Sequence, residues 1–218
     1  MSEFIGDAGV LVQPDGGVPV EDAGKVAGWQ NGSGPVVTLT FDDGPSKTFT
    51  PQLLRVLAKQ GVKAAFFVLG QRLQDGGVPI MKSAFNAGHQ IGNHSFNHPL
   101  LTKLSEAEIA DQLKKTHDLI ADCASPKKYF RPPYGATNAH VKAVAMRGGY
   151  TTILWDDDTL DWQDRDPSWM ATGLRLIKAR GRTIVLNHDI HKSTVDNIDG
   201  FIDSIRKRFP NVTFLPLG

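Results

Sequence analysis

Two histidines four residues apart are the first side chains in this sequence whose spacing suggests chemistry. His94 and His98 stand at positions i and i+4, which puts two imidazoles on one face of a helical turn, the arrangement that suits a divalent metal ion. Two unrelated polar residues near a turn before Pro99 would give the same spacing. The pair alone therefore leaves a metal site and a plain turn both open.

Two adjacent carboxylates form a second candidate group. Asp42 and Asp43 precede Gly44, and Asp-Gly is a common turn dipeptide. The pair also follows an apolar stretch that ends at Phe41, and neighbouring carboxylates can divide labour, one binding a cation while the other accepts a proton. Two histidines and one aspartate would leave one metal position open for water, as catalytic zinc sites do.

Other polar residues give weaker signals. His191 follows His188 by three residues and could form a second metal pair, although an unrelated pair is the simpler interpretation. The aspartates at 156–158 suit either a calcium loop or a solvated turn, but they lack the glycine and the distal glutamate of an EF-hand loop. Cys123, the one cysteine, is expected to be an inert packed thiol. Three further histidines are expected at the surface or in supporting positions: His89, His117 and His140.

From residue 36 onward, short apolar stretches alternate with helical segments. Their lengths and their β-branched and aromatic content favour buried strands at 36–41, 64–68, 90–93, 129–131, 151–155, 183–187 and 212–215. Helices are predicted between them, at 51–60, 79–87, 105–121, 138–147, 167–179 and 195–208. Such alternation implies one α/β domain, with a parallel sheet covered by helices, as an open sheet or as a barrel.

The segment 105–121 has the clearest helix signal. Ser105 and Glu108 have the spacing of a capping box, and Ile109 and Leu113 repeat on one helical face. The sequence therefore predicts an amphipathic helix that begins directly after Ser105.

The reactive residues follow the predicted strands. They are Asp42 to Gly44, His94 with His98, Arg131 to Gly135, Asp158 to Trp162, and His188. In α/β barrels and open sheets alike, sites form at the carboxyl ends of the strands. We therefore expect these residues to share one site at that edge of the sheet.

The composition excludes several classes of protein. The 24 basic residues against 23 acidic ones give a formal charge of +1, which argues against a nucleic-acid binder. No apolar run approaches the ~20 residues that span a bilayer. Residues 1–35 are rich in glycine and proline and are expected to form an arm, with Trp29 as an anchor. Residues 1–4 lack the features of a secretory signal, so the localisation stays open.

In order, these clusters resemble the five motifs of the polysaccharide deacetylase family, the carbohydrate esterases with a NodB homology domain. They read Thr-Phe-Asp-Asp-Gly-Pro at 40–45, His-Ser-Phe-Asn-His-Pro at 94–99, Arg-Pro-Pro-Tyr-Gly at 131–135, Asp-Thr-Leu-Asp-Trp at 158–162 and Leu-Asn-His at 186–188. The likeness extends from residue 36 to 218, which we expect to be the catalytic domain. The ordered set is far more specific than any one motif.

The resemblance implies a single distorted (β/α) barrel of seven or eight strands, in agreement with the seven predicted. It also implies a divalent metal ion held by Asp43, His94 and His98, with zinc as the usual ion and cobalt or nickel as substitutes. By the same resemblance, Asp42 matches the catalytic base and His188 the catalytic acid.

Five further positions match family residues with supporting roles. Arg131 corresponds to the residue that orients the base, and Asp158 to the one that tunes the acid. Tyr134 corresponds to the position whose backbone N–H helps to hold the oxyanion. Trp162 and Leu186 would form the walls of the pocket that receives the acetyl methyl group.

The resemblance therefore implies a metal-dependent hydrolase that removes acetyl groups from N-acetylglucosamine residues of chitin, chitooligosaccharides or peptidoglycan. The same residues would cleave esters, so an acetylxylan O-deacetylase is the alternative. A non-catalytic carbohydrate-binding protein is a third possibility, disfavoured because every expected catalytic position is filled. We expect a monomer with an open groove for an acetylated glycan. Export is expected from the family, although residues 1–4 give no sign of it.

Overall fold

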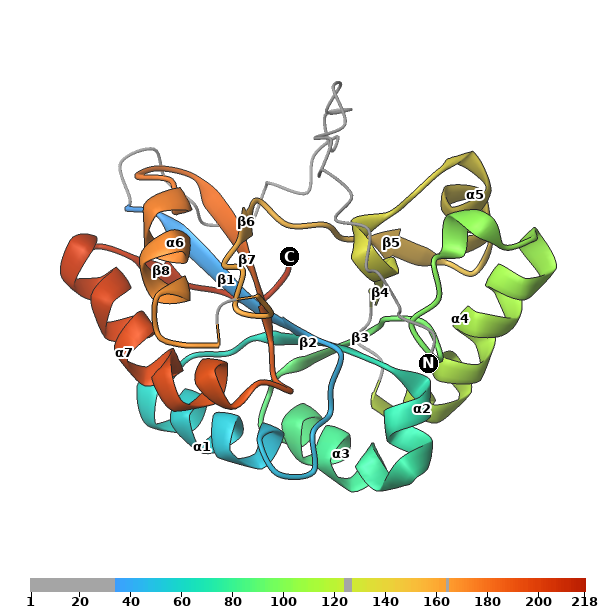
Figure 1. The fold of residues 1–218 in the computed structure, drawn as a ribbon, viewed down its shortest axis with the longest axis horizontal. Helices are drawn as coiled ribbons and strands as arrows, with labels where there is room; N and C mark the ends of the chain where they lie inside the picture. Colours follow the sequence, from blue (N-terminus) through green and yellow to red (C-terminus); the bar gives the residue numbers. More distant parts are fainter. Residues whose placement is uncertain (1–33, 124–126, 164) are drawn as a thin grey trace, which may run out of the picture. The chain divides into compact units, whose positions relative to one another are not determined.

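Eight strands form one parallel sheet in the computed structural model, in which residues 34–123, 127–163 and 165–218 are described. They are β1 (Val36–Asp42), β2 (Ala65–Val68), β3 (Gln90–Asn93), β4 (Lys128–Phe130), β5 (Tyr150–Thr152), β6 (Asp157–Asp158), β7 (Arg182–His188) and β8 (Thr213–Phe214). The order across the sheet is β5-β4-β3-β2-β1-β7-β6, and β8 pairs with the start of β1. The sheet curls into a distorted (β/α) barrel (Figure 1). The barrel stays open between β5 and β6, because no hydrogen-bonded ladder joins these two strands among the described residues.

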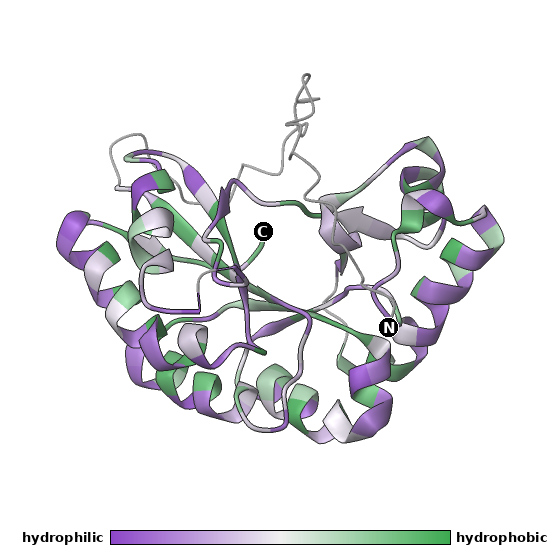
Figure 2. Ribbon diagram, in the orientation of Figure 1, coloured by the Kyte–Doolittle hydropathy of each residue, from purple (hydrophilic) through white to green (hydrophobic). Residues whose placement is uncertain are grey.

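The described part of the chain forms seven α-helices that accompany this sheet. They are α1 (Thr50–Gln60), α2 (Gly70–Arg72), α3 (Val78–Asn86), α4 (Glu106–Ile120), α5 (Ala139–Arg147), α6 (Trp169–Leu176) and α7 (Lys192–Arg208). Shorter helical turns are η1 (Leu73–Gly77), η2 (Leu101–Lys103), η3 (Ala121–Cys123) and η4 (Pro133–Gly135). The helices line the outer side of the curled sheet, with hydrophilic residues toward solvent and hydrophobic residues toward the strands (Figure 2).

The alternation of side chains along β1 separates the outer core from the inner face. Val37, Leu39 and Phe41 belong to the cluster that packs the sheet against the helices. Because successive side chains of a strand point to opposite faces, Thr40 and Asp42 point to the inner face. All seven residues of β1 are buried, so this polar row lies inside the barrel.

A second, smaller cluster fills the inner face of the sheet. It contains Phe67, Tyr129, Ile153 and Leu217. Leu217 is held there by Gln90, whose side-chain amide donates to the Leu217 carbonyl oxygen and accepts from its N–H, both at 2.8 Å. Since Gln90 begins β3, this contact lies at the amino ends of the strands and leaves the carboxyl ends for the site.

The seven predicted strands are all present, some shifted or shortened by up to three residues. The prediction for 156–158 was wrong, because Asp157 is fully buried and Asp157–Asp158 form β6, an eighth strand paired with β7. The predicted strand at 151–155 ends at Thr152. Of the two positions expected for His89, the surface is wrong, because this histidine is buried. Its Nδ1 accepts a hydrogen bond from the Ala64 N–H.

The predicted helices are present with small changes at their ends. The capping box of Ser105 and Glu108 is confirmed at the start of α4. The segment at 167–179 is helical only over α6, and α7 begins three residues earlier than expected. Most of the predicted arm, including Trp29, lies outside the described residues, so the arm stays a prediction.

Within the described residues, no helix has the length and apolar character that a membrane span requires.

The capping box at α4 gives a test of how far local signals support the fold. We expect Ser105→Ala to lower the free energy of unfolding by about 1 kcal/mol, because the Glu108 N–H loses its partner at the helix start. Urea denaturation measures the change. Ser83→Ala, an exposed serine inside α3, is the control and should stay within about 0.5 kcal/mol of wild type. Equal effects of the two substitutions would contradict the role of the cap.

Candidate active site

Three side chains converge at the carboxyl ends of β1 and β3. Asp43 Oδ1 lies 3.4 Å from His94 Nε2 and 3.3 Å from His98 Nε2. The three ligand atoms all lie within 4.8 Å of one another, which makes this group a candidate metal site. The geometry thus brings together the three residues expected to hold a metal.

The donor set fits a divalent ion such as zinc. Ligand atoms about 2.0–2.1 Å from a tetrahedral zinc ion lie roughly 3.3 Å from one another, close to both measured separations. Asp43 Oδ1 is buried and has no hydrogen-bond partner among the described residues. Burial disfavours the charged carboxylate, yet His94 and His98 hold the pKa of Asp43 well below its ordinary value. Asp43 therefore remains an anion ready to bind a cation.

His94 is oriented through its second ring nitrogen. Its Nδ1 lies 2.7 Å from the Arg131 carbonyl oxygen. Because a carbonyl oxygen only accepts hydrogen bonds, Nδ1 donates to it, and Nε2 is the ring nitrogen that faces Asp43. The backbone directly after β4 thus orients the imidazole of a residue that follows β3.

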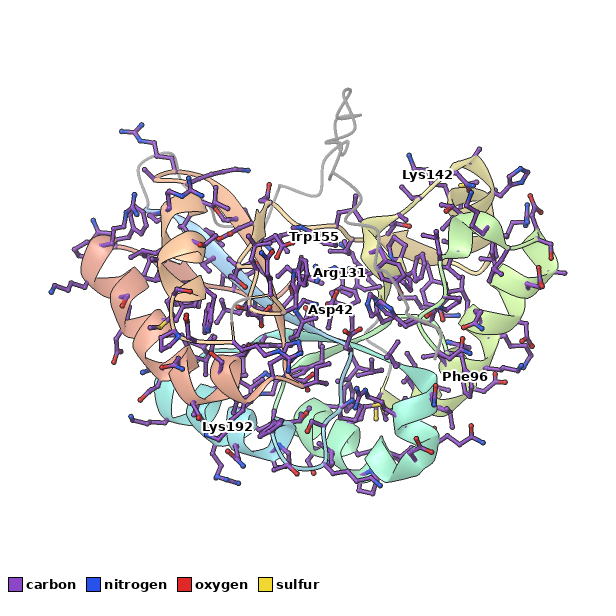
Figure 3. All side chains as sticks on the ribbon, viewed as in Figure 1. Asp42, Phe96, Arg131, Lys142, Trp155 and Lys192 are labelled. Atoms are coloured by element: carbon purple, nitrogen blue, oxygen red, sulfur yellow. The ribbon has the colours of Figure 1, made fainter. Side chains whose placement is uncertain are left out.

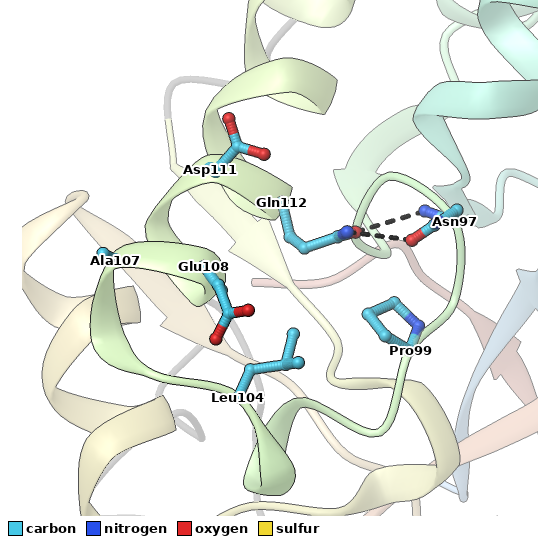
Figure 4. Close-up of a pocket in the computed structure, with 7 residues that line it drawn as sticks. All are labelled: Asn97, Pro99, Leu104, Ala107, Glu108, Asp111 and Gln112. Carbon is cyan, nitrogen blue, oxygen red and sulfur yellow. Dashed lines mark hydrogen bonds between the residues drawn. The ribbon is translucent and has the colours of Figure 1, made fainter.

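Helix α4 holds the loop that carries His98. Gln112 Oε1 accepts from the Phe96 N–H at 2.9 Å. It also accepts from the Asn97 N–H at 3.2 Å, and Gln112 Nε2 donates to Asn97 Oδ1 at 2.8 Å (Figure 4). Two of these residues also line a groove of about 510 Å³ beside the loop. The lining residues are Asn97, Pro99, Leu104, Ala107, Glu108, Asp111 and Gln112. The groove neighbours the candidate metal ligands and does not include them.

A buried ion pair fixes Asp42. Arg131 Nη1 donates to Asp42 Oδ1 and to Thr40 Oγ1, both at 2.8 Å. The other carboxylate oxygen, Oδ2, lies 3.6 Å from His94 Nε2. Arg131 is fully buried and Asp42 is 2% exposed, so this charge pair is shielded from solvent. One oxygen of Asp42 is therefore anchored, and the other lies on the side of the metal triad.

Aromatic rings enclose the guanidinium of Arg131. It lies 4.2 Å from the centre of the Phe67 ring and 5.5 Å from that of Trp155. Its remaining donors bind the carbonyl oxygens of Ile153 and Leu154 in the connection from β5 to β6. Asp42, Arg131 and Trp155 lie one above another across the inner side of the sheet (Figure 3).

His188 faces this group from β7, in register with Asp42. Its Nδ1 donates to Asp161 Oδ1 at 2.8 Å, and its N–H donates to Asp161 Oδ2 at 2.8 Å. Burial lowers the pKa of His188, but the hydrogen bond and charge of Asp161, followed by the charges of Asp42 and Asp43, outweigh it and raise that pKa to about 9. His188 is therefore an imidazolium at neutral pH, with Nε2 as the nitrogen that can release a proton.

Asp161, which the sequence did not single out, makes the direct contact with His188, and the expectation that Asp158 tunes His188 stays a prediction. Asp158 Oδ1 accepts from the Leu160 N–H at 2.9 Å, and Leu160 has a φ of 59°. This turn reverses the chain and carries Asp161 back under His188. The charge of Asp158 still acts on His188 from a distance, and Asp158 holds the turn.

The three expected pocket residues surround the same edge. Tyr134 is 65% exposed, and its ring lies 4.5 Å from that of His98, centre to centre. Trp162 is 43% exposed, whereas Leu186 is buried two residues before His188 on the same face of β7. All predicted site residues therefore lie at one end of the sheet.

Sequence reasoning missed the roles of Asp161, Trp155 and Thr40. Asp161 stands inside the fourth motif, where Asp158 is an equally plausible partner by spacing alone. Trp155 ends the segment that is predicted as a strand at 151–155, and Thr40 begins the motif that contains Asp42. The alternation of β1 was the one available signal, since it places Thr40 and Asp42 on the same face.

The chain is similar to known proteins in sequence. A family model described as polysaccharide deacetylase matches residues 30–153. A peptidoglycan-N-acetylglucosamine deacetylase of Listeria monocytogenes is 41% identical over 177 residues, which make up 79% of this chain and 36% of that protein. The chain thus spans about a third of the length of this relative.

Solved structures resemble it as well. A family 4 carbohydrate esterase from Streptomyces lividans, in complex with acetate, matches with a TM-score of 0.74 and 32% identity over 82% of this chain and 91% of that one. A pseudoenzyme of the same esterase family from Bacillus anthracis matches with a TM-score of 0.74 and 32% identity over 83% of this chain and 63% of that one.

The candidate metal ligands can be tested without a substrate. We expect His98→Ala to weaken zinc binding at least about 100-fold, since loss of even an outer partner of a ligand costs 10- to 100-fold. Competition with a chelator and elemental analysis after dialysis measure the effect. His140→Ala, which removes an exposed histidine paired with Glu106, is the control and should bind zinc as wild type does. Unchanged affinity in His98→Ala would mean that the ligands are misassigned.

The contact between Asp161 and His188 predicts a pH effect. Asp161→Asn should lower the pKa of His188 from about 9, because the hydrogen bond to a charged partner and the nearest negative charge are then lost. NMR titration of the imidazole measures it. A raised pKa stabilises the fold fully below pH 6.5, and this contribution disappears as pH rises through about 9. The difference in unfolding free energy between wild type and Asp161→Asn should shrink over that range.

Asp158→Asn is the matched control for this substitution. It leaves the hydrogen bond between Asp161 and His188 in place, so the pKa of His188 should fall less than in Asp161→Asn. The opposite order would reinstate Asp158 as the partner of His188.

Proposed function

This chain belongs to the polysaccharide deacetylase family, and we propose that it hydrolyses the acetamido group of N-acetylglucosamine residues in a glycan, releasing acetate. The observation that carries the proposal is the placement of an anchored carboxylate, Asp42, and a protonated imidazole, His188, next to one metal-ligand triad. A base and an acid are the two groups that hydrolysis of an amide requires.

Asp43, His94 and His98 would hold the divalent ion. Two nitrogens and one carboxylate oxygen suit zinc, with a further position left for substrate or water. When bound, such an ion polarises the acetyl carbonyl and makes water more acidic. The ligand set uses no sulfur, in keeping with the burial of the one cysteine, Cys123, at the end of η3.

Asp42 serves as the base in this proposal. Its Oδ1 is held by Arg131, and its Oδ2 lies on the side of His94, where a water approaching the acetyl carbon would lose its proton. The opposite charge of Arg131 holds this carboxylate in place. The carboxylate therefore needs no rearrangement when the proton arrives.

His188 completes the reaction as the acid. The water oxygen forms a bond to the acyl carbon, the C–N bond breaks, and the departing nitrogen takes the proton of His188 Nε2. Asp161 keeps the imidazole charged until that moment and oriented by Nδ1. The backbone N–H of Tyr134 is the proposed donor to the oxygen that becomes negative, and a donor of this kind contributes about 10²- to 10³-fold in rate.

Trp162 and Leu186 would bound the pocket for the acetyl methyl group. Leu186 is buried beside His188, and Trp162 follows Asp161 directly, so both adjoin the proposed acid. An exposed indole and the exposed ring of Tyr134 also offer flat faces for a sugar.

Amide hydrolysis makes a greater demand than ester hydrolysis on an acid such as His188. An amine is a poor leaving group unless it is protonated, whereas an alcohol needs less help. A histidine whose pKa is raised to about 9 still carries the proton that an amine leaving group requires. Acetylxylan therefore remains the second candidate substrate, and peptidoglycan or chitin-like chains are the first.

The similarity to a pseudoenzyme means that the fold alone does not settle activity. The proposal depends on the filled positions Asp42, Asp43, His94, His98 and His188, since each supplies a group that the reaction needs. A non-catalytic glycan binder would need none of this proton chemistry.

Acetate release tests the proposed function. Purified protein loaded with zinc should release acetate from chitooligosaccharides and peptidoglycan faster than from acetylxylan, and a chelator should stop the release. Asp42→Asn should lower kcat by about 10²- to 10⁴-fold while zinc stays bound, because an amide in place of the carboxylate cannot accept the proton of the water. Faster turnover of acetylxylan would favour the esterase, and equal rates in wild type and Asp42→Asn would remove Asp42 from the base role.

A further inference from the structure

A buried aspartate that has no part in the proposed chemistry lies behind the turn that carries Asp43. Asp189 directly follows His188 and is fully buried. Its Oδ1 has no hydrogen-bond partner among the described residues. A buried carboxylate with an unpartnered oxygen is costly, so its presence calls for a physical reason.

The carboxyl group of Asp189 packs directly against Gly44. A Cβ atom built on Gly44 would collide with both carboxylate oxygens of Asp189, so a side chain there would force the carboxyl group to shift. Gly44 follows Asp43, whose φ of 69° is rare for a residue with a side chain. The carboxyl group therefore supports the backbone directly next to a strained metal ligand.

The same carboxyl group holds the far end of this turn. Thr50 Oγ1 donates a hydrogen bond to Asp189 Oδ2, and Thr50 begins α1. The Ser46 N–H in turn donates to Thr50 Oγ1 at 2.7 Å. The segment from Gly44 to Thr50 is thus fastened to Asp189 at both ends.

Asp189 also stands where the regular contact between β1 and β7 stops. The two strands pair residue by residue up to Asp42 and His188. Beyond that pair the chains diverge, Asp43 toward the metal ligands and Asp189 into the interior. The contacts of Asp189 with Gly44 and Thr50 continue the link past the last pair of the ladder.

We propose that Asp189 is a positioning residue that clamps the turn from Asp43 to Thr50 onto the end of β7. The clamp fixes the metal ligand Asp43 relative to the acid His188, which precedes Asp189 in the chain. The inference rests on the proposed function for the roles of these two residues. In this proposal, Asp189 acts through the turn and not through a contact of its own with the metal-ligand atoms or with His188 Nε2.

Zinc affinity is the first measurement, because it requires no substrate. In Asp189→Ala, the turn loses its support, and zinc binding should weaken about 10- to 100-fold in competition with a chelator. Asp189→Asn keeps the shape and an acceptor for Thr50, so it should recover most of the affinity. Asp157→Ala removes another fully buried aspartate, on β6, and should bind zinc as wild type does.

Kinetics give a second measurement that a general loss of stability would not reproduce. With zinc saturating, Asp189→Ala should lower kcat on a chitooligosaccharide at least about 10-fold and leave KM near the wild-type value, because misplacing reacting groups by 1 Å can cost 10²-fold. Asp189→Asn should restore kcat.

A double substitution tests the contact with Gly44. Gly44→Ala alone should weaken zinc binding, since its Cβ meets the carboxyl group. In Gly44→Ala/Asp189→Ala the methyl group has room, so zinc affinity should not fall below that of Asp189→Ala alone. Additive losses would overturn the proposed contact.

Thr50→Val covers the case in which Asp189→Ala does not fold. It removes the hydrogen bond to Asp189, and the one from the Ser46 N–H, with little change of shape, and it should weaken zinc binding by a smaller factor. Folded Asp189→Ala or Thr50→Val protein that binds zinc as wild type does, or additive losses in the double variant, would refute the clamp. Wild-type protein that releases no acetate, while these variants still lose zinc, would refute the proposed function alone.

Discussion

A guanidinium buried inside the barrel is the constraint on which the site depends. Arg131 is fully buried, and an ion in such a place costs several kcal/mol unless charge and hydrogen bonds compensate it. Asp42, Thr40 and two carbonyl groups of the β5–β6 connection provide that compensation. Removing one partner of a buried ion pair costs about 3–5 kcal/mol, because the other charge is left unpaired. The contacts of Arg131 therefore orient Asp42 and, at the same time, hold β1, the end of β4 and this connection together.

The backbone around the site stores strain that its neighbours offset. Asp43, His98 and Tyr134 have φ values of 69°, 62° and 60°. Left-handed conformations of such residues cost about 1–3 kcal/mol each and persist only where the surroundings determine them. Gln112 provides this for the His98 loop, and Asp189 lies where it can do so for Asp43. The reactive residues thus lie on backbone in the left-handed conformation, which neighbouring side chains hold in place.

The sequence was sufficient for the fold class and for the edge where the site lies. Buried parallel strands are almost continuously apolar, as in β2, and caps such as Ser105 mark the helix starts. The sequence could not predict β6, because a strand of two residues is too short to show an alternation of apolar and polar side chains. It also could not choose between Asp158 and Asp161, since that choice depends on the left-handed turn at Leu160. Leucine gives no signal for this conformation.

The pairing of β1 with β7 joins residues that are far apart in the chain. The hydrogen bond from Thr40 Oγ1 to the Val185 carbonyl oxygen closes a separation of 145 residues. The metal ligands, by contrast, all come from the first three strands and the loops that follow them. Folding slows as contacts become more distant in sequence, because chain entropy is lost before those contacts form. The metal ligands are therefore joined by contacts of moderate separation in the chain, whereas the proton donor on β7 reaches them through contacts that span about two thirds of its length.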